Sequence, residues 1–433
     1  MSEAAHGTEP TGDVELAGAK ILLVGINYAP EVTGIAPYTT AVSRHLVERG
    51  ADVTVITGVP HYPEWRVPAG YGRLSSVEWL DGVRVIRVRH YVPRRQDVLR
   101  RGLFEASWLA GALVQAMRFP PDVVLAVSPP LAALPLARAV ARRRSVPWGA
   151  VVQDLMGNAA ARSGIEGGGR VAGRVAGFEG AQLAAADLVG VIGEGFGDSV
   201  VRMGVDRAKV RLLPNWTHVE QVEVGRDEAR RRLGWTDGGT VVVHTGNMGA
   251  KQGLENVVDA AALADERGSA VNFVLVGDGS QRGELESRAR GLRRLRFVPP
   301  VSAEDYPYVL AAADLLLVNE RPGMVEMSLP SKLTSYLAAG RPVVAAVPDD
   351  GWTAQLLRDT AAAAVVAPGR PAALLDVVLD LGADPVRRRA MSAAASSFAE
   401  LRYGQDSALA KYCAFVGEML MSRHAGEIVA GRT

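Results

Sequence analysis

Residues 241–265 read VVVHTGNMGAKQGLENVVDAAALAD, and this stretch indicates the fold class. The continuous apolar run at 241–244 is typical of a strand buried on both faces of a sheet. The apolar spacing from Leu254 to Asp265 predicts an amphipathic helix. Three glycines separate the two segments, namely Gly246, Gly249 and Gly253. A buried strand, a glycine-rich turn and a helix in this order predict an α/β domain with a parallel sheet.

The same alternation of short apolar runs and amphipathic segments extends along the whole chain. The strand candidates form one series at 21–25, 53–56, 83–88, 123–127, 148–152 and 188–192, and a second at 241–244, 273–276, 296–298, 315–318 and 343–345. The pattern breaks near 211–224, where Pro214 and Asn215 interrupt it. We therefore expect an α/β protein with two doubly wound Rossmann-like domains facing across a cleft. The expected domains are 19–216 and 217–400, with a helical segment over 401–433.

Length and composition limit the function classes. The 433 residues suit two domains of about 200 residues each, and 48% of them are hydrophobic. A formal net charge of +1 gives no reason to expect nucleic acid as a partner. The single cysteine, Cys413, excludes a disulfide framework and a cysteine-based metal site, and it fits a reducing cytoplasm.

We expect no signal peptide in residues 1–18 and no membrane-spanning helix in the longest apolar stretch. Residues 1–18 are acidic and small, so we expect a disordered tail rather than a signal peptide. The longest apolar stretch, 123–137, is interrupted by prolines and is shorter than the roughly 20 residues that a membrane span needs.

Parallel sheets bind ligands outside the carboxyl ends of their strands, so the strand-to-helix turns are candidate binding loops. The first turn, 25–38, lacks the G-x-G-x-x-G dinucleotide pattern, and its Gly34 allows the backbone to approach a ligand closely. In the turn at 244–254, three glycines expose main-chain N–H groups to an anion, and Lys251 adds a full positive charge. The turn at 277–280 reads as a plain turn, with a place beside a nucleotide as the alternative.

The turn at 321–332 leads into another predicted helix, which Gly340 ends. Ser331 is a good N-cap, and Lys332 falls at the first helical position. A lysine there opposes the helix dipole, at a cost of roughly a few tenths of a kcal/mol, unless an anion is bound. Lys332 therefore indicates a phosphate site, and a solvated lysine is the alternative.

Six phrases carry a resemblance to a known family. They are 27–35 (NYAPEVTGI), 60–65 (PHYPEW), 153–155 (QDL), 213–216 (LPNW), 246–249 (GNMG) and 330–333 (PSKL). Taken together and in this order, they resemble the GT4 family of retaining glycosyltransferases, which have the GT-B fold, and within it the WcaI-like and WbuB-like branch. The resemblance covers nearly the whole chain from Lys20.

The resemblance implies a separate function for each of the two domains. The C-terminal domain would bind a nucleoside-diphosphate sugar, GDP- or UDP-linked, and the N-terminal domain the acceptor. The last helix, around 405–421, would cross back to the first domain. The resemblance also implies metal-independent chemistry without a cofactor, and the sequence agrees in having no Asp-x-Asp. Lys251, Lys332 and main-chain N–H groups would then offset the diphosphate charge.

The resemblance also implies roles for individual residues. Lys251, Lys332 and the N–H groups of Gly249, Ser328 and Leu329 would stabilise the leaving phosphates, with Gly34 near the diphosphate from the other domain. The remaining donor-site candidates are Gly246, Asn247, Met248, Gln252, Val298, Glu326 and Ser331. Among them, Glu326 and Asn247 would contact sugar or phosphate oxygens, while Met248 and the segment 298–301 would border the base. Asp154 and Gln153 would orient the acceptor hydroxyl, and a buried ion pair is the alternative for Asp154.

Five residues, in three parts of the chain, depart from the wider GT4 pattern. Asn247 and Gln252 stand where that pattern has an Arg and a Lys. Met327 and Ser335 stand where it has two glutamates, with Glu326 one residue away from the first. Gln153 aligns with its acceptor-side histidine. The WcaI-like branch shares most of these changes, so they do not indicate an inactive protein.

Two acceptor classes fit the sequence. Residues 84–101 contain seven arginines and one acid, followed by Leu103, Phe104, Trp108 and Leu109. Such a segment suits an anionic membrane surface and a lipid-linked glycan acceptor, with the protein in the cytoplasm or at the inner face of the membrane. A solvated charged face beside a core helix explains the segment equally well. The Ala- and Arg-rich composition is typical of a high-GC actinobacterium, in which a related enzyme would instead glycosylate a small specialised metabolite.

Two rival functions remain open at the sequence level. The chain would be a catalytically silent nucleotide-binding or scaffold subunit if nucleotide bound without turnover. It would be a nucleotide-sugar epimerase if the nucleotide sugar were converted without an acceptor.

Overall fold

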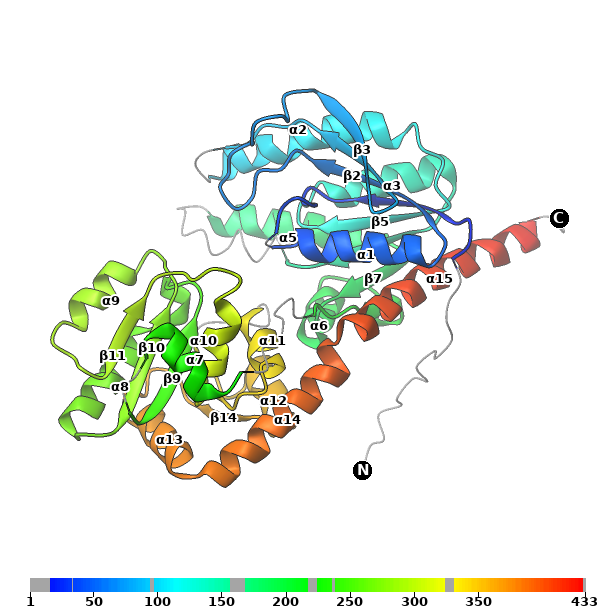
Figure 1. Cartoon of the computed structure of the whole chain (residues 1–433). Helices are drawn as coiled ribbons and strands as arrows, with labels where there is room; N and C mark the ends of the chain where they lie inside the picture. Colours follow the sequence, from blue (N-terminus) through cyan, green and yellow to red (C-terminus); the bar gives the residue numbers. More distant parts are fainter. Residues whose placement is uncertain are drawn as a thin grey trace. The chain divides into compact units, whose positions relative to one another are not determined.

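The computed structural model describes residues 16–32, 34–93, 97–155, 168–216, 224–235, 238–323 and 331–430. The chain divides into two compact units, one of Met1–Asn215 with Ala408–Thr433 and one of Trp216–Ser407. Each unit has an open, mainly parallel sheet flanked by helices, as Figure 1 shows. The prediction of two Rossmann-like α/β domains is confirmed.

The first unit is built on a sheet of eight strands in the order β3-β4-β2-β1-β5-β6-β7-β8. The strands are β1 (Lys20–Val24), β2 (Asp52–Gly58), β3 (Ser75–Leu80), β4 (Val83–Val88), β5 (Val123–Ser128), β6 (Trp148–Val152), β7 (Leu188–Val191) and β8 (Val210–Leu212). The helices are α1 (Ala36–Glu48), α2 (Val98–Ala116), α3 (Ala133–Arg144), α5 (Gly168–Ala184), α6 (Glu194–Arg202) and the short η1 (Arg207–Lys209). The chain starts in the middle of the sheet at β1 and extends to both sides, which is the doubly wound arrangement.

The second unit has a sheet of six strands in the order β11-β10-β9-β12-β13-β14, with all described pairs parallel. The strands are β9 (Thr240–Thr245), β10 (Val271–Val276), β11 (Leu295–Val298), β12 (Leu315–Asn319), β13 (Val343–Ala346) and β14 (Ala363–Val366). The helices are α7 (Arg226–Leu233), η2 (Ala250–Gln252), α8 (Glu255–Glu266), α9 (Arg282–Arg288), α10 (Tyr306–Ala312), α11 (Ser331–Ala338), α12 (Trp352–Asp359), α13 (Pro371–Ala383) and α14 (Pro385–Tyr403). The last helix, α15 (Gln405–Ala430), begins in this unit and continues into the first.

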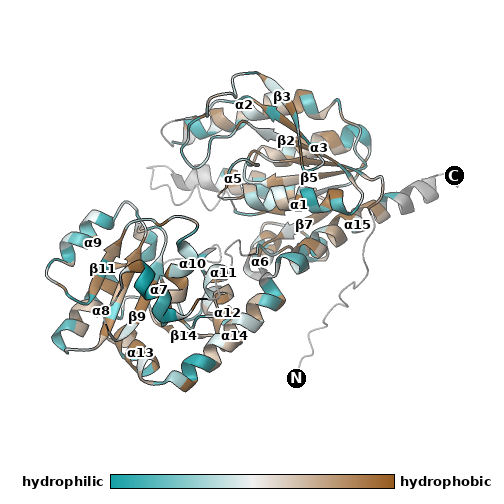
Figure 2. Ribbon diagram, viewed as in Figure 1, coloured by the Kyte–Doolittle hydropathy of each residue, from teal (hydrophilic) through white to brown (hydrophobic). Residues whose placement is uncertain are grey.

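The central strands form the core of each unit. Every residue of β5, β6, β7, β12 and β13 is buried, and Figure 2 shows the strands as largely hydrophobic between helices with polar outer faces. Burial on both faces explains why these strands read as continuous apolar runs rather than as alternating patterns.

Three strands were not predicted from the sequence. β3 pairs antiparallel with β4 at the sheet edge, and its exposed Val77 and Trp79 alternate with less exposed neighbours. β8 has three residues, and β14 lies in an alanine-rich run of low strand propensity. Edge strands of this kind lack the continuous burial that identified the others.

The disordered tail expected over 1–18 extends too far, because residues 16–18 are folded. Leu16 is buried, its N–H donates to Arg49 O at 3.1 Å, and the N–H of Gly18 donates to Gly50 O at 2.9 Å. These bonds fix residues 16–18 beside the end of α1, so they belong to the folded unit. Residues 1–15 lie outside the described part of the chain.

Residues 408–430 of α15 belong to the first unit. Phe415 is buried against Gly149 of β6, where an added Cβ would lie 2.7 Å from the Phe415 ring. Glu418 pairs with Arg211 of β8 at 2.5 Å, and Arg423 pairs with Asp122 at 2.5 Å. The chain therefore returns to the unit in which it began.

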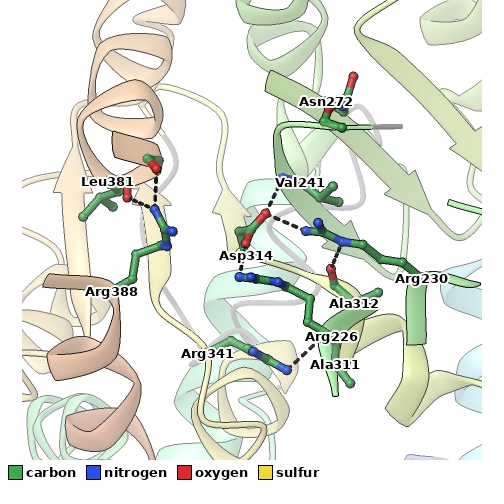
Figure 3. Close-up of polar contacts among 12 residues, drawn as sticks. Arg226, Arg230, Val241, Asn272, Ala311, Ala312, Asp314, Arg341, Leu381 and Arg388 are labelled. Atoms are coloured by element: carbon green, nitrogen blue, oxygen red, sulfur yellow. Dashed lines mark hydrogen bonds and ion pairs between the residues drawn. The ribbon is translucent and has the colours of Figure 1, made fainter. Parts of the chain in front are cut away.

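A buried carboxylate ties the first helix of the second unit to its sheet. Asp314, just before β12, accepts hydrogen bonds from Arg226, from Arg230 at 2.5 Å and from the N–H of Val241 at 2.8 Å. Figure 3 shows these groups converging, with Arg341 donating to Ala311 O nearby. The cluster lies at the amino-terminal ends of β9 and β12, away from the strand ends where ligands bind in such sheets.

Candidate functional site

The donor-site candidates of the second unit lie at the carboxyl ends of β9, β10 and β12. The turn after β9 and the turn after β10 are bonded to each other: Met248 N–H donates to Asp278 O at 2.8 Å, and Gln281 N–H donates to Met248 O at 2.9 Å. Gly277 has φ 141°, and an added Cβ would lie 2.0 Å from Gly246 O. The turn at 277–281 therefore packs against the Gly246 turn. This close approach requires a glycine at position 277.

Two buried asparagines hold the next part of the turn. The Asn319 side-chain amide donates to Gln252 O at 2.7 Å and to Gly253 O at 2.9 Å, and its oxygen accepts from Asn256 at 2.8 Å. The N–H of Arg321 donates to Lys251 O at 3.0 Å. Sequence reasoning missed both asparagines. The sequence signal for Asn319 was its position as a polar residue at the end of the buried run 315–319.

His244 and Lys332 form the centre of the cluster. His244 is fully buried in β9, and its Nδ1 lies 3.1 Å from Leu317 O, a carbonyl that can only accept. Nδ1 therefore carries the proton, and Nε2 accepts from Lys332 Nζ at 3.0 Å. A Cβ added to Gly246 would lie 3.9 Å from Nζ. The ammonium group thus lies against the Gly246 turn.

Burial determines the charge state of this pair. It lowers the pKa of His244 well below its usual value, and the positive charge of Lys332 lowers it further. Burial also lowers the pKa of Lys332 to about 7, although the nearby Glu320 carboxylate raises it in part. A bound anion would favour the charged form of Lys332. His244 was missed from the sequence, and a histidine inside an apolar strand was its signal.

A hydroxyl network holds the end of β9. Tyr336 of α11 accepts from the N–H of Thr245 at 2.8 Å, and the Thr245 hydroxyl lies 3.0 Å from the Tyr306 hydroxyl. Burial raises the pKa of Tyr306 and of Tyr336, so both hydroxyls keep their protons. This network fixes α11, and with it Lys332, against the Gly246 turn.

The structure separates the predicted donor-site residues into groups. Gly246, Asn247 and Lys251 are exposed on the turn. The N–H of Gly249 donates to Gln252 Oε1 at 3.2 Å, so this N–H has a partner within the protein. Val298 O accepts from the N–H of Gly277 at 3.0 Å, which places Val298 beside the same cluster.

Five further predicted residues have different outcomes. The Met248 side chain is fully buried in the core of the second unit, so here it packs under the turn rather than bordering an open base site. Ser331 and Lys332 both lie within α11 as described, Ser331–Ala338. Glu326, Ser328 and Leu329 lie outside the described residues.

In the first unit, Glu31 connects the segments 27–35 and 60–65, which both carry the family resemblance. Glu31 is buried, and its Oε1 accepts from the N–H groups of His61 at 2.7 Å and Tyr62 at 2.9 Å. Its Oε2 accepts from Asn27 at 2.8 Å. Gly34, with φ 67°, would bring a Cβ within 3.2 Å of the Tyr62 ring. The turn that carries Gly34 is therefore fixed by contacts to 60–62, which sequence reasoning did not find.

The acceptor-side candidates follow β6. Gln153 is buried, its N–H donates to Ser128 O at 2.8 Å, and its side-chain oxygen accepts from Asn215 at 2.8 Å. Asp154 is exposed, and its Oδ1 accepts from the N–H of Leu155 at 2.9 Å. The alternative of a buried ion pair for Asp154 is therefore wrong. No group of three His, Cys, Asp or Glu side chains suited to a metal is found among the described residues.

The predicted basic and aromatic segment is rearranged in the structure. Phe104 and Trp108 are buried core residues. Arg87 is also buried and pairs with Glu78 at 2.5 Å, while Arg100 pairs with Asp97 at 2.7 Å. Besides Arg100, α2 exposes the apolar side chains of Leu99, Leu103 and Val114. In the described part of the chain, no helix is long and apolar enough to cross a membrane.

Two family models match the chain. A "Glycosyl transferase 4-like domain" matches residues 33–216, and "Glycosyl transferases group 1" matches residues 239–384. The chain is 35% identical over 336 residues to a protein of Escherichia coli strain K12 assigned to colanic acid biosynthesis as the glycosyl transferase WcaI, covering 74% of this chain and 81% of that protein.

Solved structures share the fold at low identity. Sucrose-phosphate synthase of Thermosynechococcus elongatus has a TM-score of 0.70 and 18% identity, covering 94% of this chain and all of that one. The Alr3699/HepE protein of Anabaena, crystallised with UDP, has a TM-score of 0.65 and 17% identity, covering 93% of this chain and 100% of that one.

Proposed function

Because the chain belongs to the GT4-like glycosyltransferases, of the WcaI type, we propose that it transfers a sugar from a nucleoside-diphosphate sugar, GDP- or UDP-linked, with retention and without a metal. The single observation that carries this proposal is the half-buried Lys332 ammonium against the Gly246 turn. A partly desolvated cation with a pKa of about 7 gains a full charge when a diphosphate binds beside it. The donor therefore binds to the second unit.

The proposed transfer balances without an added base. The acceptor hydroxyl attacks the anomeric carbon on the face from which the diphosphate departs, the bond from that carbon to the diphosphate oxygen breaks, and the diphosphate takes the acceptor proton. Lys332 and Lys251 offset the charge that grows on the leaving oxygen. Gln153 and Asp154 in the first unit would orient the acceptor.

We propose a lipid-linked glycan as the acceptor rather than a small metabolite, with the protein held at the inner face of the cytoplasmic membrane. The support is the exposed apolar face of α2, where Leu99, Leu103, Ala106, Ala110 and Val114 follow helical spacing. Binding to vesicles containing anionic lipid, which Leu103→Glu should weaken, tests this part of the proposal. Tight binding to a small aminoglycoside-like acceptor with no vesicle binding would favour the metabolite.

The donor assignment is tested by thermal unfolding with EDTA present, against GDP, UDP, dTDP, ADP and CDP. A ligand at 100 times its Kd adds about 2.7 kcal/mol of stability. We expect one diphosphate to raise the Tm in wild type and to do so much less in Lys332→Met. If no diphosphate shifts the transition, the donor site is wrong. If one binds but no transfer occurs with any acceptor, a silent nucleotide-binding subunit explains the chain better.

A further inference from the structure

The first unit contains an open cavity of about 840 Å³ that the proposed donor site does not use. It lies where β4 ends, between the segment 65–72, the segment 89–92 and Ser107 of α2. This is the carboxyl end of a parallel strand, where α/β sheets place ligand sites. The cavity volume falls in the range of small-molecule sites, roughly 300–1,000 Å³.

The described lining has a defined chemistry. Trp65, Tyr71 and Tyr91 are its aromatic residues, and Arg66 and Arg89 are its cations. No Asp or Glu occurs among the described lining residues. Two guanidinium groups without a carboxylate favour an anion, which arginine binds in a bidentate manner. Aromatic rings offer flat apolar area with polar edges, which suits a sugar ring.

The segment 89–92, which carries Arg89, is hydrogen-bonded to both walls of the cavity. The Nη1 of Arg89 donates to Gly72 O at 2.9 Å, and its backbone N–H donates to Leu74 O at 3.0 Å. On the other side, the N–H of Tyr91 donates to the Ser107 hydroxyl at 2.9 Å. The segment 89–92 is therefore fixed, and a fixed arginine loses less freedom when it binds an anion.

Trp65, in the cavity wall, has a constrained backbone conformation. Its φ of 49° lies in the left-handed region, which is an outlier for a bulky side chain. Ring contacts hold it there, with centroid distances of 5.6 Å to His61 and 5.6 Å to Phe104. Outliers of this kind concentrate at functional sites.

His90 completes the wall without adding charge. Burial lowers its pKa to about 4, and its Nδ1 lies 3.2 Å from Val88 O. The imidazole is therefore neutral at physiological pH. The positive charge of the described lining comes from Arg66 and Arg89, and it persists across the range in which most enzymes work.

We propose that this cavity binds the acceptor as an anionic glycoside, with the aromatic side chains against the sugar and Arg66 and Arg89 on a phosphate, diphosphate or carboxylate. The role as acceptor site rests on the proposed function, whereas binding of an anionic sugar does not. A lipid-linked sugar diphosphate and a free sugar phosphate share this chemistry. The aromatic and cationic groups contact the two halves of the same ligand.

The test uses the full chain and calorimetric titration with the 1-phosphates of glucose, galactose and mannose and with glucuronic acid. Methyl α-glucoside is the neutral comparison, and inorganic phosphate is the free-anion comparison. We expect at least one charged sugar to bind, with methyl α-glucoside and phosphate at least tenfold weaker. Arg66→Ala and Arg89→Ala should each weaken the charged sugar about tenfold, since a charge-assisted hydrogen bond of about 1.4 kcal/mol is one decade. Tyr91→Ala should weaken it and Tyr91→Phe should not.

Matched variants locate the site and separate this proposal from the previous one. Arg73→Ala removes an exposed arginine outside the lining and should leave binding unchanged. Lys332→Met should also leave it unchanged, because a sugar phosphate in the donor site would depend on Lys332. Binding of vesicles that contain a lipid-linked sugar phosphate, lost in Arg66→Ala and Arg89→Ala, identifies a lipid source, and equal binding of the free sugar phosphate identifies a soluble one.

Three outcomes overturn the inference. They are the absence of saturable binding by every charged sugar, binding that phosphate alone reproduces, and binding that the arginine and tyrosine variants leave intact. The Tm shift by nucleoside diphosphate is measured on the same samples. If that shift persists while no charged sugar binds, the cavity proposal fails and the donor proposal stands. If charged sugars bind and no nucleotide does, the reverse holds.

Discussion

At the scale of single residues, the Lys332 ammonium links ligand binding to pH. Burial lowers its pKa from the usual value of 10.5 to about 7. Between these values the unfolded chain holds a proton that the folded chain does not, so this group's contribution to stability rises with pH from about 7 to 10.5. A bound diphosphate reverses the preference, because it favours the charged ammonium.

We therefore predict that diphosphate binding takes up a proton above pH 7. Affinity should fall about tenfold per pH unit above 7, up to the pKa of Lys332 in the complex, since the free protein then holds the neutral amine. Titration calorimetry in buffers of different ionisation enthalpy measures the proton uptake. Lys332→Met should bind more weakly and lose this slope. A slope that survives in Lys332→Met would assign the proton to another group.

A second residue-scale prediction concerns the contact between the two turns. Gly277→Ala would put a Cβ 2.0 Å from Gly246 O at a φ of 141°. We expect a loss of about 1–3 kcal/mol from backbone strain, together with weaker diphosphate binding because the Gly246 turn must move. Denaturant unfolding and nucleotide titration measure the two effects. The control is Gly283→Ala in α9, where nothing lies within 4 Å of an added Cβ and the change should be neutral or stabilising.

At the scale of elements, the sequence predicted what depends on local pattern. The buried strands β1, β5 and β9 stand out because central parallel strands are continuous apolar runs. Edge strands such as β3 and β14 carry no such run, and they were missed. The turn glycines and Lys332 were found from local chemistry, whereas Glu31, His244 and Asn319 were not. Their partners come from segments about 30 to 70 residues away, which a single sequence does not bring together.

The Asp314 cluster makes α7 depend on one carboxylate. Asp314→Ala leaves Arg230, whose side chain is 14% exposed, without its carboxylate partner and removes the acceptor for Val241 N–H. Breaking a buried ion pair typically destabilises by about 3–5 kcal/mol, so we expect a large drop in Tm of the second unit. Asp305→Ala removes an exposed pair with Arg232 and should change the Tm little. Equal Tm values for the two variants would contradict the buried role of Asp314.

At the scale of the whole molecule, the chain enters the second unit once at Asn215–Trp216 and leaves it near Ser407. The first unit is therefore completed by a segment made after the second unit. Phe415 and Met419 pack on Gly149 of β6, and Glu418 pairs with Arg211 of β8. The stability of the early strands β6 and β8 thus depends on residues more than 200 positions later.

This arrangement predicts where damage to α15 appears. Phe415→Ala removes a fully buried ring, which typically destabilises by about 3–5 kcal/mol. Hydrogen exchange should accelerate in β6, β7 and β8, while β9, β10 and β12 should keep their protection because they belong to the other unit. Met421→Ala on the same helix removes a side chain that is 68% exposed and should leave exchange unchanged in both units. If Phe415→Ala accelerated exchange equally in both sheets, the two units would unfold as one, and diphosphate binding to the second unit would then protect the first as well.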